Sequence, residues 1–181
     1  MKTKNFTRAI MMSSLLVIVW SCSKDNSVST KNEKASVLNN AKGATQISGI
    51  NYFDETDGCN ATGQGATYAL IMTGDLQGCL YTYIDSFSCS PSGTYMELGR
   101  EYFVGTYKGE TGTFWTNYRF EAKFEGCAEN GSYVGLEIKG RCQHPIAKDS
   151  GTGVFEGVTG RLDMRDDLEA GNYPYTGHLQ L

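Results

Sequence analysis

The sequence predicts an all-β protein, an eight-stranded antiparallel up-and-down barrel, from its composition and its turn signals. The 181 residues include 22 Gly, 11 Tyr and 8 Phe but only 3 Pro, a balance that favours β structure. Glycine-bearing turns separate short β-rich segments, and there is no long amphipathic helix or sequence repeat. A closed barrel leaves no free sheet edge, which makes it the preferred arrangement; an open β-sandwich is the alternative.

Residues 1–21 are expected to be a signal peptide and not part of the fold. Lys2, Lys4 and Arg8 form a basic start, and residues 9–20 are an apolar run too short to span a bilayer comfortably. Residues 19–22 resemble the lipobox of bacterial lipoproteins, which implies that Cys22 carries the lipid, with palmitate among its acyl chains. An ordinary signal peptide or a short buried segment is the alternative.

The residues after Cys22 bear on location and on tethering. No Asp directly follows Cys22, which resembles sorting to the outer membrane or cell surface of a Gram-negative bacterium. Residues 22–44 are rich in Ser, Asn, Lys and Thr, and are predicted to be a lipidated flexible linker.

Residues 45–181 form the predicted barrel domain. Its nine basic and 18 acidic residues leave a net charge of −9, which argues against nucleic acid as a partner.

Eight strands are predicted by period-two alternation between turn signals. They cover residues 66–73, 79–85, 93–104, 112–125, 132–142, 151–156, 161–166 and 173–181. A ninth candidate at residues 46–53 alternates imperfectly and is left out of the count. Asn130-Gly131 is the strongest hairpin signal. The last strand, 173–181, is expected to close the barrel against residues 66–73.

Two strands alternate clearly enough to separate a core face from a solvent face. In residues 112–125, Phe114, Tyr118 and Phe120 share one face with two further apolar residues, Ala122 and Phe124. In residues 132–142, the apolar set Val134, Leu136, Ile138 and Cys142 shares one face, and Tyr133, Glu137, Lys139 and Arg141 share the other.

Five cysteines remain besides Cys22, and export favours disulfides among them. If the strands alternate in direction, Cys79 and Cys142 lie at one end of the barrel. Cys89 and Cys127 lie at the other end, together with Cys59. We therefore expect the bridges Cys79–Cys142 and Cys89–Cys127, with Cys59 free or competing for the second bridge.

Candidate site residues are those able to line a barrel cavity. They are Tyr81, Tyr83, Tyr118, Phe120, Glu97 and Glu121. Core packing is the alternative role for the aromatic residues, and a surface salt-bridge ladder is the alternative for the carboxylates. His144 and His178 lie in no pattern typical of a catalytic triad, and no metal, cofactor or catalytic residue is predicted.

The C-terminal region adds a resemblance. Residues 140–146, followed by Phe155-x-Gly157-x-x-Gly160 and Tyr175-x-Gly177-x-Leu179, resemble the allene oxide cyclase-like barrel superfamily, in its uncharacterised secreted bacterial branch. That resemblance implies an eight-stranded barrel with an apolar cavity, and it transfers no catalytic residue.

The function expected is therefore a non-catalytic, membrane-anchored barrel that binds a small apolar or amphipathic ligand, or acts as an envelope interaction module. An isomerase or cyclase acting on a lipid-like substrate is one alternative. A surface adhesion or glycan-binding protein using Trp115 and tyrosines is another.

Overall fold

The computed structural model describes residues 43–181. The predicted signal peptide, the predicted lipidation site Cys22 and residues 22–42 of the predicted linker lie outside the described residues. Within residues 43–181, no helix is long and apolar enough to cross a membrane.

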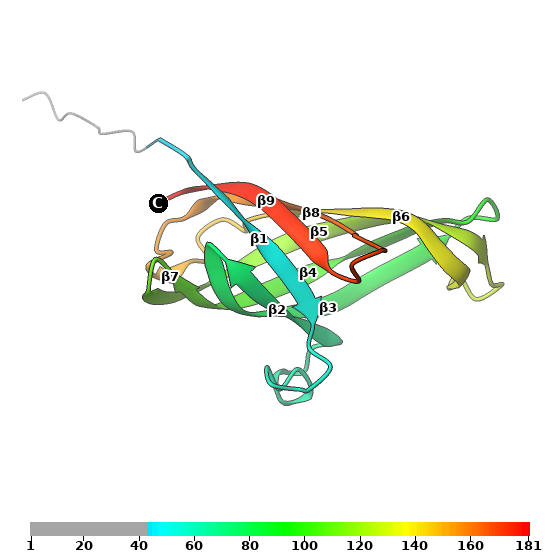
Figure 1. Cartoon of the computed structure of the whole chain (residues 1–181), viewed down its shortest axis with the longest axis horizontal. Coiled ribbons are helices and arrows are strands. Elements are labelled where there is room, and N and C mark those ends of the chain that lie inside the picture. The colour runs from blue at the N-terminus through cyan, green and yellow to red at the C-terminus, as the bar shows by residue number, and fades with distance from the viewer. Residues whose placement is uncertain (1–42) are drawn as a thin grey trace, which may run out of the picture. The chain divides into compact units, whose positions relative to one another are not determined.

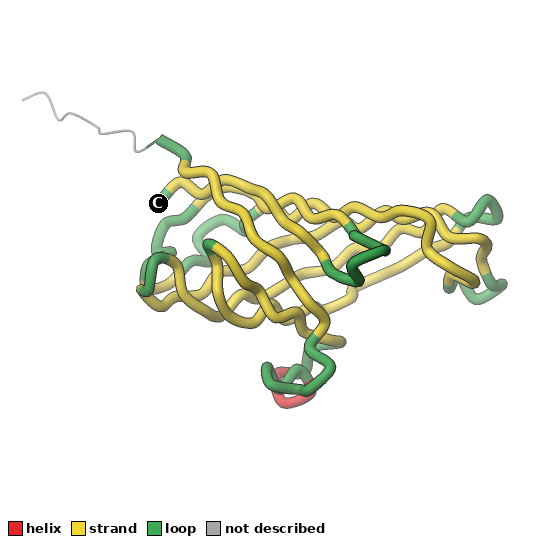
Figure 2. Tube along the Cα trace, viewed as in Figure 1, coloured by secondary structure: helices red, strands yellow, loops and turns green. Residues whose placement is uncertain are grey.

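Eight antiparallel strands close into the predicted barrel (Figures 1 and 2). They are β1 (Thr45–Phe53), β2 (Tyr68–Gly74), β3 (Leu76–Cys89), β4 (Thr94–Tyr107), β5 (Glu110–Cys127), β6 (Tyr133–Pro145), β8 (Thr159–Arg165) and β9 (Tyr173–Gln180). Each strand pairs with the next along the chain, and β9 pairs with β1 to complete the ring. The up-and-down barrel predicted from the sequence is confirmed.

The first strand of the barrel is β1. It corresponds to the candidate at residues 46–53 that was left out of the eight predicted strands. Its inner face carries Ile47, Gly49 and Asn51, so only part of that face is apolar. Gly49 is required there because a Cβ atom would overlap the Thr73 carbonyl and the Tyr175 ring. The expectation that the last strand closes against residues 66–73 is corrected accordingly, since β9 pairs with β1 and β1 pairs with β2.

The predicted strand at residues 151–156 is wrong, because this segment forms a plug at one end of the barrel. Only β7 (Thr152–Gly153) is extended, and it pairs with β5. Turns follow: the Phe155 N–H donates to the Thr152 carbonyl at 3.1 Å, and the Val158 N–H donates to the Phe155 carbonyl at 2.9 Å. These turns insert Phe155 and Val158 into the barrel, where both side chains are fully buried.

The plugged end of the barrel is packed with apolar side chains. Phe155 meets the rings of Phe103 and Phe114 with centroids 5.7 and 5.0 Å apart, in edge-to-face contact. The cluster continues through Leu76, Leu80 and buried residues of the other barrel strands, and β6 contributes the partly buried Cys142. The largest hydrophobic cluster of the domain therefore lies at the plugged end, and a smaller one around Tyr95, Ala122 and Phe124 lies beside the cavity.

Strand β6 contains a bulge that reverses its expected faces. Lys123 of β5 pairs with Lys139, but the next residue, Phe124, pairs with Glu137, so Ile138 is skipped. Cys142 faces inward as expected. A second register shift follows between Phe124 and Gly126. Ile138 at the bulge is exposed, and N-terminal to it Leu136 is 74% exposed and Val134 is exposed too. Glu137, expected on the solvent face, lies inside.

The disulfides confirm one expected bridge and correct the other. Cys89 joins Cys127 as predicted, but Cys79 joins Cys59 and leaves Cys142 unpaired among the described cysteines. The bridge Cys79–Cys142 is wrong because β3 begins at Leu76. Cys79 therefore lies within the strand and faces outward with Tyr81, whereas Cys142 faces the interior.

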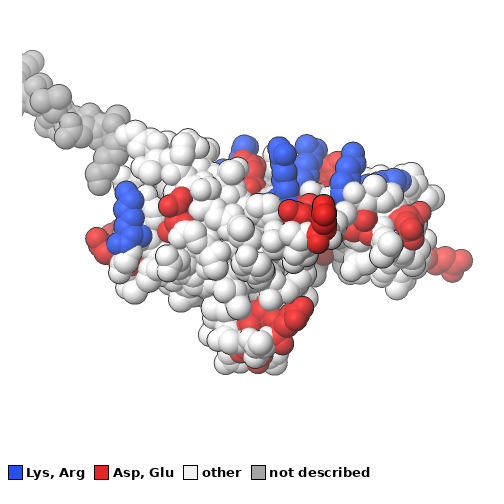
Figure 3. Space-filling view, in the orientation of Figure 1, with Lys and Arg blue, Asp and Glu red and all other residues white. Residues whose placement is uncertain are grey.

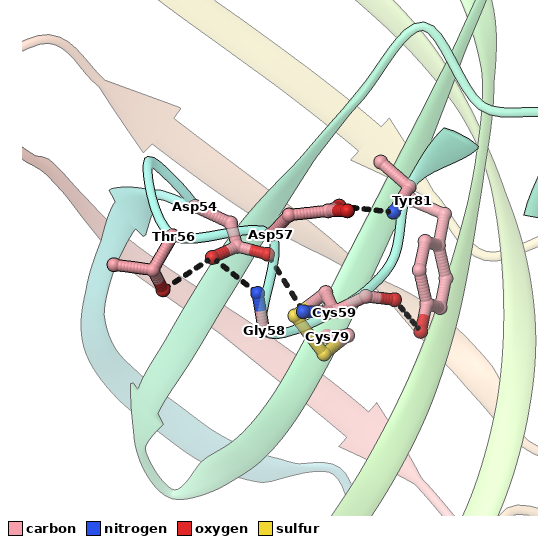
Figure 4. Close-up of a disulfide and its surroundings, with 8 residues drawn as sticks. Asp54, Thr56, Asp57, Gly58, Cys59, Cys79 and Tyr81 are labelled. Atoms are coloured by element: carbon pink, nitrogen blue, oxygen red, sulfur yellow. Dashed lines mark hydrogen bonds between the residues drawn. A yellow bond between two sulfur atoms is a disulfide. The ribbon is translucent and has the colours of Figure 1, made fainter. Parts of the chain in front are cut away.

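The Cys59–Cys79 bridge fastens the β1–β2 loop, which contains the short helix η1 (Thr62–Gln64), to the outside of β3 (Figure 4). The Asp54 carboxylate accepts hydrogen bonds from the backbone N–H groups of Cys59 and Gly58, which hold the pKa of Asp54 below its ordinary value. The Tyr81 hydroxyl donates to the Cys59 carbonyl at 2.8 Å. The loop is thus held by both a covalent bond and hydrogen bonds.

We predict that Phe155→Ala costs about 3–5 kcal/mol of unfolding free energy, because it leaves a cavity in the plugged end. Leu136→Ala is the control, since its side chain is exposed, and it should change stability by no more than about 0.5 kcal/mol. Urea denaturation followed by tyrosine fluorescence measures both. Equal costs, or a larger cost for Leu136→Ala, would contradict the plug and the bulge.

Candidate functional site: an acidic, aromatic-lined cavity

The other end of the barrel interior is hollow. A cavity of about 450 Å³ lies between β1–β6, β8 and β9, a size suited to one small ligand. Strands β3–β6 are 13 to 18 residues long, against 7 to 9 for β1, β2, β8 and β9, so they extend past the shorter strands (Figure 1). Eight aromatic side chains line the cavity: Phe53, Tyr68, Tyr95, Tyr118, Phe120, Phe124, Tyr133 and Tyr173.

Glu97 is the acceptor for two tyrosine hydroxyl groups in the cavity wall. Tyr95 donates to Oε2 and Tyr118 donates to Oε1, each at 2.7 Å, and Glu97 is only 7% exposed. Burial, and then the hydrogen bond to Glu97, raise the pKa of each of these two tyrosines well above the ordinary value for a tyrosine. Both hydroxyl groups therefore stay protonated and donate to the carboxylate.

Glu101 holds a second hydrogen-bond network, deeper in the barrel. Its carboxylate, 2% exposed, accepts from the hydroxyl groups of Thr82 and Thr116 at 3.3 and 3.1 Å. The Nδ1 atom of His144 lies 2.5 Å from Glu101 Oε2, and it is the donor because a carboxylate only accepts. His144 Nε2 is buried without a hydrogen-bond partner among residues 43–181, and its ring stacks on Tyr118. Glu101 thus links β3, β4, β5 and β6.

Glu137 and Asp166 form a pair of facing carboxyl groups in the wall opposite. Burial, together with the hydrogen bond shared with Asp166 and the Asp166 charge, raises the pKa of Glu137 to about 8. Burial also raises the pKa of Asp166. The two groups therefore share a proton at neutral pH. Gly140 leaves room for them, since a Cβ atom there would overlap Asp166 Oδ2 and Glu137 Oε1.

The cavity mouth is formed by aromatic side chains from the shorter strands. Phe53 contacts Tyr68 and Tyr173 at centroid distances of 5.2 and 5.3 Å, and it is about half exposed. Burial, then the charges of Asp166 and Glu137, raise the pKa of Tyr173 to about 12. Cys142 also lines the cavity, and burial raises the pKa of its thiol so far that the thiolate does not form at neutral pH.

Half of the six candidate cavity residues lie where they were predicted. Tyr118, Phe120 and Glu97 line the cavity. Tyr81 and Tyr83 face outward and donate hydrogen bonds to the carbonyls of Cys59 and Gln64 in the β1–β2 loop.

Glu121 is the third residue of this set that lies outside the cavity. It lies on the outer face, near the guanidinium groups of Arg119 and Arg141. The predicted cavity role is therefore wrong for Tyr81, Tyr83 and Glu121. All three are odd-numbered residues of β3 or β5, and their side chains point out of the barrel.

Four ionisable cavity residues were not among the predicted site residues: the carboxylates Glu101, Glu137 and Asp166, and the imidazole of His144. The alternation of β4 could have identified Glu101, because it is on the same face as Glu97. The bulge in β6 concealed Glu137. His178 lies on the outer face of β9, where it pairs in register with Arg161 and Gln46.

The outer surface carries most of its cations along one side of the barrel. Figure 3 shows Lys and Arg side chains gathered there with acidic side chains among them, and further acidic side chains on the β1–β2 loop. Two shallow surface grooves over β5, β6 and β8 are lined by the cations Arg119, Lys123, Lys139, Arg141 and Arg165 with the single carboxylate Glu121. The cations thus lie outside the barrel and the four cavity carboxyl groups lie inside.

The described residues show no metal centre. Within residues 43–181, no group of three or more His, Cys, Asp or Glu side chains is arranged to hold a metal ion. No protein-family model matches the chain, and no curated protein or solved structure matches it either.

We predict that folding stability falls as pH rises from about 4.5 to 8, in part through Glu137. Its folded-state pKa is raised above the 4.5 of the free side chain, so the folded protein binds more protons than the unfolded chain in that window. Glu137→Gln removes this contribution, so the variant should gain about 1–2 kcal/mol on wild type between pH 5 and pH 8, after allowance for solvent screening.

Urea denaturation at several pH values measures the difference. Glu121→Gln is the matched control on the outer face and should keep the wild-type slope. A Glu137→Gln variant with the same pH dependence as wild type would show that the carboxyl pair is not coupled.

Proposed function

We propose that this protein is a membrane-anchored bacterial lipoprotein whose barrel domain binds one small amphipathic ligand inside the barrel. The single observation that carries the proposal is the cavity: it is enclosed by eight aromatic side chains, and polar groups occur at a few fixed places in its wall. Small-molecule sites have this composition, mostly apolar with a few oriented polar groups. The resemblance of residues 140–179 to allene oxide cyclase-like barrels supports the same kind of cavity.

Anchoring through Cys22 supports a role at the cell envelope. The basic start, the apolar run and the Ser21-Cys22 pair are the pattern of a lipidated leader. A binding barrel held at the outer membrane could take up or hold a ligand close to the lipid surface, or serve as an envelope interaction module.

A second candidate function, an isomerase or cyclase acting on a lipid-like substrate, is favoured by one observation. His144 lines the cavity with its Nδ1 bonded to Glu101, and its Nε2 has no hydrogen-bond partner among the described residues. A histidine oriented by a carboxylate in this way can transfer a proton to or from a bound molecule. Tyr118, which stacks on His144, adds a hydroxyl group to the same wall.

The adhesion or glycan-binding alternative has weaker support. Trp115 lies on the outer face of β5, but its ring stacks on Tyr102 at 4.7 Å and contacts Tyr83 at 5.5 Å. Tyr83 in turn bonds to the β1–β2 loop. The outer aromatic residues are therefore largely occupied with one another and with that loop.

We predict that residues 43–181, purified under native conditions, retain a ligand that native mass spectrometry detects, and that Ile84→Trp abolishes its retention. Ile84 lines the cavity, so the larger ring fills the space that the ligand needs. Leu98→Trp is the control, because Leu98 is 46% exposed and lies on the outer face of β4. Absence of any co-purifying molecule from the wild type, or equal retention by Ile84→Trp, would contradict ligand binding. Deuterium incorporation into the extracted ligand on incubation in D₂O would favour the isomerase.

We predict that Cys22→Ser abolishes labelling of the full chain with radioactive palmitate and releases the protein from the membrane fraction. Cys142→Ser is the matched control and should keep the label, because Cys142 lies inside the barrel. Palmitate labelling that persists in Cys22→Ser would overturn the lipid anchor while leaving the cavity proposal unaffected.

A further inference from the structure

We infer that the ligand of the cavity carries a fixed positive charge, as an organic ammonium group, which contacts Glu137 and Asp166 while its apolar part lies against the aromatic wall. The inference rests on the proposed ligand-binding function and adds to it the chemical class of the ligand.

The cavity wall is acidic and has no compensating cation besides one histidine. It contains the carboxyl groups of Glu97, Glu101, Glu137 and Asp166, and among the residues of the described chain that line it, none is Lys or Arg. Even with His144 counted as a cation and one proton shared by Glu137 and Asp166, the wall keeps two negative charges. A negative, low-dielectric enclosure attracts cations and repels anions.

The four carboxyl groups differ in how many hydrogen bonds they accept from donor groups of the protein. Glu97 accepts two tyrosine hydroxyl groups, and Glu101 accepts two threonine hydroxyl groups and an imidazole N–H. Glu137 faces Asp166, and its Oε1 atom is buried with no donor group of residues 43–181 bonded to it. Buried carboxylate oxygens without donors are costly, so this pair is the part of the wall that an external cation stabilises most.

Aromatic rings surround the same pair. A Cβ atom at Gly140 would meet Asp166 Oδ2, Glu137 Oε1 and the Phe120 ring together, so these three groups converge on one point. Tyr173 and Tyr133 line the same cavity as the two carboxyl groups. Carboxylates with aromatic rings form the usual recognition site for ammonium groups through ion pairing and cation–π contact.

An inorganic cation fits this site less well. Calcium takes six to eight oxygen ligands, and magnesium requires an octahedral shell. The pair offers two carboxyl groups, and no cluster of three or more acidic, His or Cys side chains arranged for a metal occurs within residues 43–181. The rest of the surroundings are rings and apolar side chains, which suit an organic cation.

Three probes of similar size that differ in charge test the inference on residues 43–181. Phenyltrimethylammonium is the cation, tert-butylbenzene is its neutral isostere, and benzenesulfonate is an anion. Titration followed by protein NMR gives the three dissociation constants. We predict that phenyltrimethylammonium binds about tenfold more tightly than tert-butylbenzene, on the scale of a partly desolvated cation–π and ion-pair contact, and that benzenesulfonate binds most weakly.

Two double variants test which carboxyl groups cause the preference for the cation over its neutral isostere. The double variant Glu137→Gln with Asp166→Asn should lose the preference for phenyltrimethylammonium and keep its affinity for tert-butylbenzene, which shows that the cavity is intact. Glu121→Gln with Asp163→Asn is the matched control: it makes the same two kinds of substitution on the outer faces of β5 and β8 and should keep the preference.

The outcomes separate this inference from the function on which it rests. Equal binding of the cation and its isostere to wild type, or a preference for benzenesulfonate, would overturn the cationic ligand and leave ligand binding in place. Failure of all three probes to bind would contradict the binding cavity itself. Retained preference in the double variant would overturn the assignment to Glu137 and Asp166.

Discussion

The hydrogen bonds to the buried carboxylate of Glu101 set the layout of the barrel interior. A carboxylate at 2% exposure is tolerable only with donors on its oxygen atoms, and Thr82, Thr116 and His144 supply them from three neighbouring strands. Two residues further along β4, Phe103 belongs to the apolar core. The Glu101 network therefore marks the boundary between the plugged, apolar end of the barrel and the hollow, acidic end.

The two ends have opposite consequences for stability and for binding. The plugged end buries rings and aliphatic side chains around Phe155, and this burial supplies the hydrophobic stabilisation of the domain. The hollow end has polar groups in place of part of that burial: Glu137 and Asp166 face each other in its wall, and Glu137 Oε1 has no donor among residues 43–181. Functional sites commonly depart from the rules of good packing in this way. The acidic, aromatic wall is thus more simply explained by an occupant than by folding.

Local patterns in the sequence predicted a large part of this structure. Turn signals such as Asn130-Gly131 predicted the hairpins. The period of two in β5 predicted its inner face, which includes Tyr118 and Phe120. The Cys89–Cys127 bridge followed from strand direction alone. Three of the six candidate cavity residues were identified correctly in the same way, because alternation sorts residues into two faces once the register of a strand is regular.

The remaining features depend on contacts between strands, which local patterns do not reveal. The Gly49 position in β1 makes room for Tyr175 of β9, so the alternation of β1 looks weak in isolation. The bulge at Ile138 turned Leu136 outward and Glu137 inward, and nothing in the alternation of β6 marks it. Register shifts of one residue exchange the two faces of a strand, so the bulge concealed Glu137.

The central claim is that the barrel is hollow beside Glu137 and Asp166. A high-resolution crystal structure of residues 43–181 at neutral pH, without added ligand, tests it most directly. The account predicts electron density for water or a small molecule in a cavity of about 450 Å³, in contact with both carboxyl groups. An interior filled by the side chains of Phe124, Tyr133 and Phe53, with Glu137 turned out to solvent, would contradict it.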